Sequence, residues 1–477
     1  MLNARKWIHQ DIGQEFAGAS LGDARRTGRL QQVARVALRN PDQGFPRMVS
    51  SDVELEGVYR FFSNEAVESD AVLEPHIVET LKRAQQAPLC LVVHDTTQFD
   101  FKGEPREGLG LTTVGKSSGF FAHFALAVLP GEARLPLGIC GLEHFARTKR
   151  KSGKRKPHSY YTAQDPERES LRWFRMLEDV EARREEEGFE CIHVMDREGD
   201  IFDLMAKAVE LKARFIIRGD KERALANEAG YLQDVLKRLE PRVYRKVEIS
   251  ARFATKRHHK IPKRRRVTRK ARTAKLSVGA ASVEIRAPKT AHSELPSLKV
   301  NVVYVWENSP PPGEDPIDWL LVTSEPIATK KQLLAVVDNY RSRWVVEDFF
   351  KALKTGCAFE KRQLESYHAL SNALAVLSVV AWRLLLVRAL ARSQPNGRAS
   401  SAFNATQLAI LQHHLELPQP LVTAGDAYLA LARLGGHIKN NGDPGWITLG
   451  RGFKELLVLE AGFHIASKIL GKNVINP

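Results

Sequence analysis

The amino-acid sequence predicts an α/β fold with helical regions at both ends of the chain. Between residues 89 and 218, short apolar runs alternate with helical patterns, which is typical of an α/β sheet. Residues 225–325 hold alternating apolar segments separated by Pro and Gly, which indicates a β-rich region. Residues 1–70 have helical spacing, and apolar helices are predicted at residues 370–392, 405–414, 424–434 and 453–470. A chain of 477 residues has room for two or three domains.

The charge of the chain favours a polyanionic partner. The 72 Lys and Arg residues outnumber the 56 Asp and Glu residues, so the formal charge is +16, and nucleic acid is the first candidate. Four cysteines form no C-x-x-C pair, which argues against structural zinc and a disulfide framework. The first residues lack the apolar core of a signal peptide, and the longest apolar run, residues 373–382, is too short to span a bilayer. We therefore expect a cytosolic protein in which this run is a buried helix.

The N-terminal region predicts an amphipathic helix with a basic start. Its apolar positions follow the offsets 0, 3, 4, 7 and 8 of one helix face, at Leu30, Val33, Ala34, Ala37 and Leu38. Three arginines come just before this face: Arg25, Arg26 and Arg29. They indicate either a charged surface turn or a small DNA-contacting domain whose arginines face a groove or the phosphate backbone.

Two carboxylates follow apolar runs in the α/β region. Residues 89–95 form a predicted strand that ends at Asp95, and residues 190–196 form another that ends at Asp196. Further strands are predicted at residues 120–129, 135–142 and 214–218, with helices at residues 167–187 and from residue 201. Because ligands of α/β sheets bind beyond the carboxyl ends of the strands, both aspartates are candidate site residues.

Residues 110–117 (GLTTVGKS) match the P-loop pattern, which raises the alternative of a P-loop NTPase. That pattern requires a helix that opens at Lys116 and Ser117. A strand-like run follows instead, so we expect no nucleotide site there. Two basic runs lie at residues 149–156 and 256–275, and the second holds eleven Lys or Arg in twenty residues. Each is either a solvated loop or a salt-dependent contact with phosphates.

The stretch of residues 338–354 (DNYRSRWVVEDFFKALK) predicts a helix with a chemically mixed face. Tyr340, Arg343, Glu347 and Lys354 have offsets 0, 3, 7 and 14, which fall within roughly 60° of one another on an α-helix. Taken alone, this stripe could be a solvated helix face with ion pairs. It could also place a metal-binding carboxylate, Glu347, between phosphate-binding cations.

Three carboxylates therefore form a candidate metal site: Asp95, Asp196 and Glu347. Oxygen-only ligands suit Mg²⁺ or Mn²⁺, which accept water and substrate phosphate as remaining ligands. Two such ions could activate a water or a 3′-hydroxyl and stabilise the departing oxygen. We expect Asp95 to bridge the two ions, with Asp196 and Glu347 each completing one.

The same residues resemble those of a known family. Tyr340, Arg343, Glu347 and Lys354 match the pattern Y-x2-R-x3-E-x6-K, and the two aspartates precede it in order. With these residues the chain resembles the DDE transposases of the insertion-sequence-four family, most closely the Tn-five type. The resemblance runs nearly end to end. It includes residues 21–30 (LGDARRTGRL), 56–61 (EGVYRF), 95–97 (DTT), 196–198 (DRE), 319–326 (WLLVTSEP) and 431–436 (LARLGG).

The resemblance implies an RNase H-like catalytic core at residues 71–365, with the β-rich insertion at about residues 225–325. It implies a DNA-end-binding helical domain at residues 1–70 and a helical dimerisation domain at residues 366–477. Asp95, Asp196 and Glu347 would hold two Mg²⁺ ions, for which Mn²⁺ can substitute. The partners would be double-stranded DNA, as transposon ends and target, and a second copy of the chain. The setting would be the bacterial cytosol, at the nucleoid and away from the membrane.

The implied reaction is cut-and-paste transposition through a nick, a DNA hairpin, hairpin opening and strand transfer in a dimeric synaptic complex. The implied DNA contacts are Tyr340, Arg343 and Lys354 at phosphates near a flipped-out nucleotide, Trp319 as its stacking wall, Trp344 against the distorted end, and Arg218 in the active site. An aromatic pocket offsets the cost of flipping a base. Gln363 stands where the family pattern favours an arginine. A catalytically silent relic or inhibitor that binds ends without cutting is the alternative.

Overall fold

The computed structural model describes residues 7–8, 10–104, 106–112, 118–147, 169–227, 230–249, 252–253, 267–393, 395–438 and 444–474. The chain divides into two compact units. The first takes residues 1–155, 178–191 and 342–477, and the second takes residues 156–177 and 192–341. The first unit thus contains parts of all three predicted domains, at residues 1–70, 71–365 and 366–477.

The first unit contains the strands β1 (Cys90–Phe101), β2 (Gly110–Leu111), β3 (Ser118–Val128) and β4 (Pro136–Phe145). Strand β3 pairs antiparallel with β1, with β4 and, at its first residues, with β2. All residues of β3 after Ser118 are buried, which explains its nearly continuous apolar sequence. The two strands predicted at residues 120–129 and 135–142 are confirmed.

The prediction that Asp95 ends its strand is wrong. Strand β1 continues to Phe101, and Asp95 lies in the middle of the ladder, opposite Phe124 on β3. The strand continues because Phe99 and Phe101 are both buried, at 0% and 3% exposure, and both rings pack against Phe120. The polar residues that alternate with them made this half of the strand resemble a loop.

The P-loop pattern leads into a strand, as expected. Its residues 113–117 lie outside the described residues, but the segment that follows is β3, and β2 pairs with the start of that strand. A P-loop needs a helix at this point, so the fold argues against a nucleotide site. The basic run at residues 149–156 lies outside the described residues, as do residues 256–266 of the second run.

The N-terminal helices of the first unit are η1 (Ile12–Phe16), α2 (Ala24–Arg39), α3 (Phe45–Met48), α4 (Asp52–Phe62) and α5 (Ser69–Gln85). Helix α2 begins after Asp23, whose side chain accepts a hydrogen bond from the Arg25 backbone at 2.8 Å and so satisfies a free amide of the first turn. The buried residues of α2 are the five of the predicted apolar face, which is therefore confirmed.

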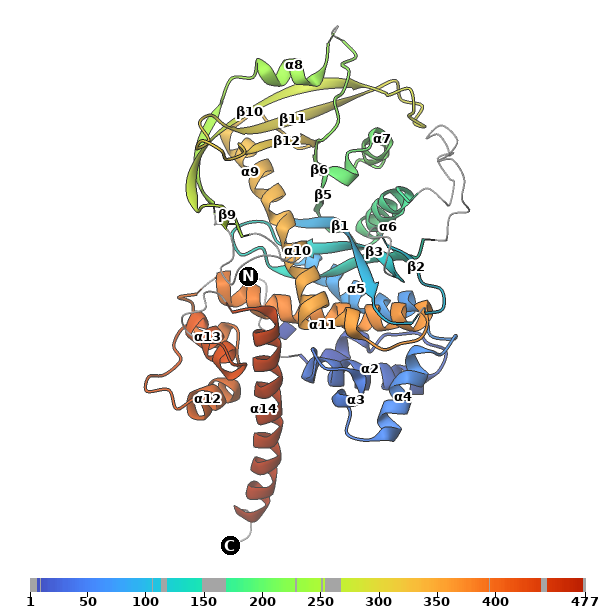
Figure 1. The fold of residues 1–477 in the computed structure, drawn as a ribbon, viewed down its shortest axis with the longest axis vertical. Helices are drawn as coiled ribbons and strands as arrows, with labels where there is room; N and C mark the ends of the chain where they lie inside the picture. The colour runs from blue at the N-terminus through green and yellow to red at the C-terminus, as the bar shows by residue number, and fades with distance from the viewer. Residues whose placement is uncertain are drawn as a thin grey trace. The chain divides into compact units, whose positions relative to one another are not determined.

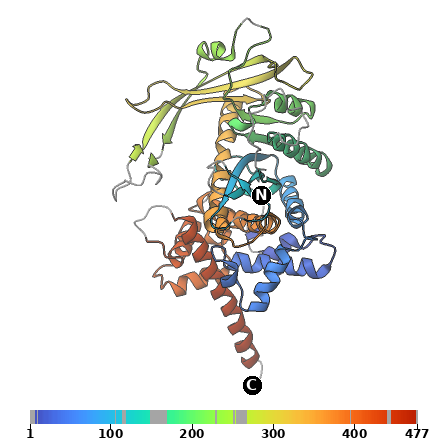
Figure 2. The same ribbon diagram turned by 45° about the vertical axis from the view of Figure 1, so that its right-hand side comes forward.

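The C-terminal helices are α11 (Tyr367–Ser393), α12 (Ala405–His414), α13 (Ala424–Leu434) and α14 (Trp446–Val474), with a short η7 (Ala399–Ser401) after α11. In both views α14 extends away from the rest of its unit (Figures 1 and 2). Helix α11 is long and apolar enough to cross a membrane by length and composition, but 83% of its most apolar window is buried within the protein. The prediction of a buried helix at residues 373–382 is confirmed.

A buried cluster of ionisable side chains joins η1, α5 and α11. Glu15, at 0% exposure, lies 2.6 Å from Nδ1 of His76, forms an ion pair with Arg83 and lies 3.9 Å from Arg383. Burial by itself would raise the pKa of Glu15, but His76 and the two arginines outweigh it and lower that pKa to about 2. We call these four residues the Glu15 cluster.

The second unit is built on a mixed sheet. Its strands are β5 (Cys191–Met195), β6 (Phe215–Arg218), β7 (Val243–Ile249), β10 (Arg272–Arg286), β11 (Ser297–Glu307) and β12 (Asp318–Thr323), in the order β5-β6-β12-β11-β10-β7. Strands β5 and β6 are parallel, and the other neighbours are antiparallel. The β-rich region therefore joins the α/β sheet through β12. Strands β8 (Arg252–Phe253) and β9 (Val267–Arg269) form a separate pair.

Helices cover this sheet, and the first three named below share an apolar core with its strands. They are α6 (Leu171–Glu187, whose first residues belong to this unit), α7 (Phe202–Glu210), α8 (Leu232–Lys237) and α9 (Lys330–Arg341). The core includes Trp173, Met205, Phe215, Val302 and Val322. In Figure 1, α9 runs beside the strands β10, β11 and β12.

The prediction that residues 338–354 form one α-helix is wrong. Helix α9 ends at Arg341 and is followed by a 3₁₀ turn, η4 (Ser342–Trp344), by α10 (Val345–Lys351) and by a π-helical turn, η5 (Ala352–Gly356). These windings turn the chain by different angles per residue, so the offsets of a regular α-helix do not fix how the four side chains lie. Arg343 and Glu347 do share a face, because they form an ion pair.

Candidate catalytic site

Asp95 is held in one orientation by two hydrogen bonds. Its Oδ1 accepts from the backbone of Thr96 at 2.8 Å, and its Oδ2 accepts from Nη1 of Arg343 at 2.7 Å. The side chain is 16% exposed, so it is sheltered but reachable from solvent. Because β1 is fixed by its long ladder with β3, the position of Asp95 depends on the sheet and not on a flexible loop.

Arg343 connects Asp95 to Glu347. Its Nη2 donates to Oε1 of Glu347 at 3.0 Å, while its Nη1 donates to Oδ2 of Asp95 at 2.7 Å. Glu347 lies on α10, which is anchored by the buried Val346 and Phe349. Arg343 is 11% exposed and Glu347 is 47% exposed. One guanidinium thus brings together two carboxylates that are far apart in the sequence. We call Asp95, Arg343 and Glu347 the Asp95 cluster.

The two carboxylates of this cluster suit a divalent cation. They already converge on one positive group, and their donor atoms are all oxygens, which Mg²⁺ and Mn²⁺ prefer. Their partial exposure leaves room for water or phosphate as further ligands. Asp95 and Glu347 can therefore hold a metal ion.

Lys354 lies against the same strand as Asp95. Its Nζ donates to the backbone carbonyl of Gln98 at 2.6 Å and lies 5.3 Å from the centre of the Phe99 ring. Burial lowers the pKa of Lys354, and the nearby carboxylates of Glu360 and Asp100 oppose this effect. Lys354, on η5, thus places a cation against β1, three residues along that strand from Asp95.

Asp196 belongs to the second unit and follows β5, as predicted. Its Oδ1 accepts from the backbone of Glu198 at 2.9 Å, so the carboxylate caps the short turn η3 (Arg197–Gly199). A nearby carboxylate, that of Asp200, is buried and accepts from the backbones of Asp220 and Lys221 at 2.8 and 2.9 Å. Asp200 therefore fixes the loop on which Asp196 stands.

Arg218, Trp319 and Tyr340 form a second group, within the second unit. The rings of Trp319 and Tyr340 are 5.5 Å apart at 73°, and the Arg218 guanidinium lies 5.5 Å from the Trp319 ring. Burial lowers the pKa of Arg218, while the Tyr340 hydroxyl acts against this. Trp319 is half-buried, whereas its neighbours Leu320 and Val322 belong to the core.

The remaining predicted DNA contacts differ in exposure. Trp344, on η4, is 49% exposed, and Arg25 is 92% exposed beside Asp23. Arg26 donates to the carbonyl of Leu21 at 2.8 Å, and Arg29 donates to Gln32 at 2.9 Å, so both are partly used inside the protein. These arginines lie within the first two turns of α2, ahead of its buried residues, as predicted.

Arg362 has a structural role that the sequence does not indicate. This residue, next to Gln363, is 1% exposed and donates to the backbone carbonyls of Pro41, at 2.6 Å, and of Gln43. It therefore secures the chain that follows α2 and does not replace a DNA-contacting arginine. No local signal distinguishes such a buried arginine, because the carbonyls of Pro41 and Gln43 are more than 300 residues away in the sequence.

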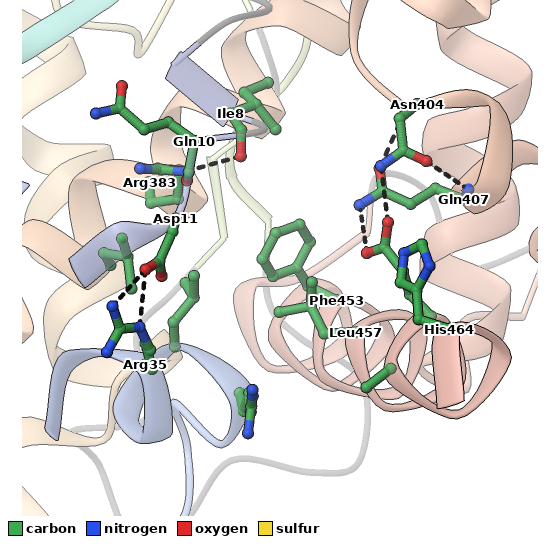
Figure 3. Close-up of a pocket in the computed structure, with 15 residues that line it drawn as sticks. Ile8, Gln10, Asp11, Arg35, Arg383, Asn404, Gln407, Phe453, Leu457 and His464 are labelled. Atoms are coloured by element: carbon green, nitrogen blue, oxygen red, sulfur yellow. Dashed lines mark hydrogen bonds and ion pairs between the residues drawn. The ribbon is translucent and has the colours of Figure 1, made fainter. Parts of the chain in front are cut away.

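A pocket of about 260 Å³ in the first unit is a separate feature (Figure 3). It is lined by the N-terminal segment and by α2, α11, α12 and α14, and no described residue that lines it is a predicted site residue. Asp11 and Arg35 form an ion pair on one side, and Asn404 and Gln407 donate to Glu460 on the other. These polar side chains therefore pair with other residues that line the pocket. The pocket is distinct from the Asp95 cluster.

A mixed α/β chain with converging carboxylates and a basic helical segment has the features of an enzyme that acts on nucleic acid. Two family models match it: a transposase DNA-binding domain at residues 6–67 and a transposase DDE domain at residues 176–383. The chain is therefore a DDE transposase, a class that uses divalent metal ions and acts on DNA. Asp196 and Glu347 lie within the matched DDE residues, Arg25, Arg26 and Arg29 lie within the DNA-binding match, and Asp95 lies between the two.

Proposed function

We propose that this protein is an active cut-and-paste transposase of the insertion-sequence-four family, Tn-five type, with an RNase H-like core. The observation that carries the proposal is the Asp95 cluster. Asp95 and Glu347 come from distant parts of the chain and converge on Arg343 at 2.7 and 3.0 Å. A purely structural ion pair does not need two partly exposed carboxylates on one cation.

Asp95, Asp196 and Glu347 would hold two Mg²⁺ ions, with Mn²⁺ as a substitute. When bound, such ions lower the pKa of a water or 3′-hydroxyl and stabilise the departing oxygen. Asp95 would be the shared ligand, because it is the most sheltered member of the Asp95 cluster after Arg343. The orientation of its carboxylate is preset by the backbone of Thr96.

The DNA would pass through a nick, a hairpin, hairpin opening and joining to target DNA. Arg343 and Lys354 would bind phosphates next to the scissile bond, and Trp344 would lie against the distorted end. In the second unit, Trp319 and Tyr340 offer a perpendicular pair of rings backed by Arg218. A base stacked on such a wall recovers part of the cost of leaving the duplex.

We assign DNA-end binding to residues 1–70, catalysis to residues 71–365 and dimerisation to residues 366–477. The outward half of α14 supports a dimeric complex, because it exposes Phe463, Ile465, Ile469 and Leu470 at 52–62%. Exposed apolar residues on one helix favour burial against a second chain. The expected site of action is the cytosol, where the element's DNA lies.

The test uses a labelled duplex that carries the element's own terminal sequence and flanking DNA. Wild type should produce a nick and then a hairpin-sized product on a denaturing gel with Mg²⁺, and neither product with EDTA. Glu347→Ala should bind the duplex and cut nothing. Asp348→Ala is the matched control, because Asp348 is the neighbouring acid on α10 and pairs instead with Lys351 at 3.5 Å.

Two results would contradict the proposal. Equal cleavage by wild type and Glu347→Ala would remove Glu347 from the chemistry. A shifted complex without cleavage in any lane would indicate the alternative of a catalytically silent, DNA-binding relic.

A further inference from the structure

Arg343 occupies the position between Asp95 and Glu347, and it uses a different nitrogen for each. Nη1 lies 2.7 Å from Asp95 Oδ2 and Nη2 lies 3.0 Å from Glu347 Oε1. A guanidinium most often presents two nitrogens to one carboxylate. Here it spans two carboxylates from different elements, so it acts as a cationic bridge between β1 and α10.

This bridge is not required to hold those elements together. Strand β1 is fixed by eleven paired positions with β3, and α10 is anchored by the buried Val346 and Phe349. Glu347 is 47% exposed, and ion pairs with so exposed a member contribute little to stability. The main effect of Arg343 is therefore on the two carboxylates, whose mutual repulsion it cancels.

A divalent ion held by the same carboxylates would compete with Arg343. Mg²⁺ needs its oxygen ligands at about 2.0–2.1 Å. An ion that used Asp95 Oδ2 and Glu347 Oε1 would therefore compete with the two guanidinium nitrogens that now contact these atoms. Two cations a few ångströms apart also repel each other strongly in a sheltered site. Both carboxylates would therefore coordinate the ion only when Arg343 pairs with another anion.

We propose that Arg343 is a positioning residue that holds the metal ligands in place of the ion until a DNA phosphate draws it away. The inference rests on the proposed function, because it needs Asp95 and Glu347 as metal ligands. A phosphate pairs well with the planar guanidinium and frees both carboxylates. DNA and metal then bind cooperatively, and each increases the affinity for the other by the same factor.

The test measures Mn²⁺ affinity by the electron paramagnetic resonance signal of aqueous Mn²⁺, which disappears on binding. The full chain is titrated alone and with the element's terminal duplex, as wild type, Arg343→Gln and Arg343→Lys. Arg341→Gln is the matched control, because Arg341 is a nearby arginine that pairs with Asp338 at 3.1 Å. Asp95→Asn identifies the Mn²⁺ that belongs to this site.

Without DNA, Arg343→Gln should bind Mn²⁺ about tenfold more tightly than wild type, within the usual range of coupling between sites. Arg343→Lys should be intermediate, because an ammonium is a compact charge that cannot span both carboxylates. The duplex should tighten Mn²⁺ binding to wild type by a similar factor and change Arg343→Gln little.

Equal or weaker Mn²⁺ binding by both Arg343 variants without DNA would overturn the inference, even if wild type cleaves DNA normally. If wild type neither cleaves DNA nor loses any Mn²⁺ binding on Asp95→Asn substitution, the proposed function fails as well. Cleavage assays on the same preparations distinguish the two failures.

Discussion

The Glu15 cluster and the Asp95 cluster both join carboxylates to arginines in the first unit, yet they differ in exposure and in charge balance. Glu15 is 0% exposed, and His76, Arg83 and Arg383 surround this single carboxylate. In the Asp95 cluster, two carboxylates at 16% and 47% exposure share one arginine. Buried charges with several partners fix a fold, whereas carboxylates that reach solvent are suited to bind a further cation.

The largest expected effect comes from the Asp95 cluster and concerns activity. Asp95→Ala should lower the rate of end cleavage by about 10⁴-fold, as for loss of an essential group in other enzymes. End binding and the thermal unfolding midpoint should change little, because Asp95 is partly exposed. Cleavage gels, gel shifts and circular dichroism melts measure the three quantities. A large loss of stability would show that the cluster is structural after all.

The Glu15 cluster should show the opposite behaviour. Glu15→Gln leaves Arg83 buried without its carboxylate, which should lower the free energy of unfolding by about 3–5 kcal/mol. Urea denaturation of the full chain measures this loss. Asp11→Asn is the control, because Asp11 is 42% exposed in its pair with Arg35, and such pairs contribute at most about 1 kcal/mol. Similar losses for both variants would mean that burial does not make the Glu15 ion pairs more stabilising than the exposed Asp11–Arg35 pair.

The pH dependence of stability sharpens the same contrast. The pKa of Glu15 falls from the ordinary 4.5 to about 2 in the folded protein. Its contribution is therefore fully present above pH 4.5 and is lost as the pH falls toward 2, by about 3 kcal/mol in all. Urea midpoints between pH 2 and 6 should show this loss in wild type and a flatter course in Glu15→Gln. Parallel curves would contradict the assignment.

The smallest expected effect concerns a third, exposed pair. Arg25 is 92% exposed and pairs with Asp23 at 2.9 Å. Arg25→Ala should weaken end binding a few-fold, reduce the salt dependence by about one charge and leave unfolding unchanged. Gel shifts at several salt concentrations measure this. An unchanged salt slope would show that Arg25 does not contact phosphate.

Local patterns were enough to predict much of the fold. The helices α12 and α13 have the predicted bounds, because helical spacing within ten or so residues determines which face is buried. The sequence also placed Asp196 after a strand and Arg343 four residues before Glu347. A spacing of four residues brings two side chains together on a helix whatever the rest of the chain does.

The tertiary structure decided what depends on distant partners. Strand β1 continues past Asp95 only because β3 and Phe120 cover its second half. The winding changes from 3₁₀ to π within residues 342–356, which no single period in the sequence records. The contact of Arg343 with Asp95 spans 248 residues, and that of Glu15 with Arg83 spans 68. Residue type and spacing determine local conformation. The cation with which each carboxylate pairs is determined only by the folding of the whole chain, because the partner lies far away in the sequence.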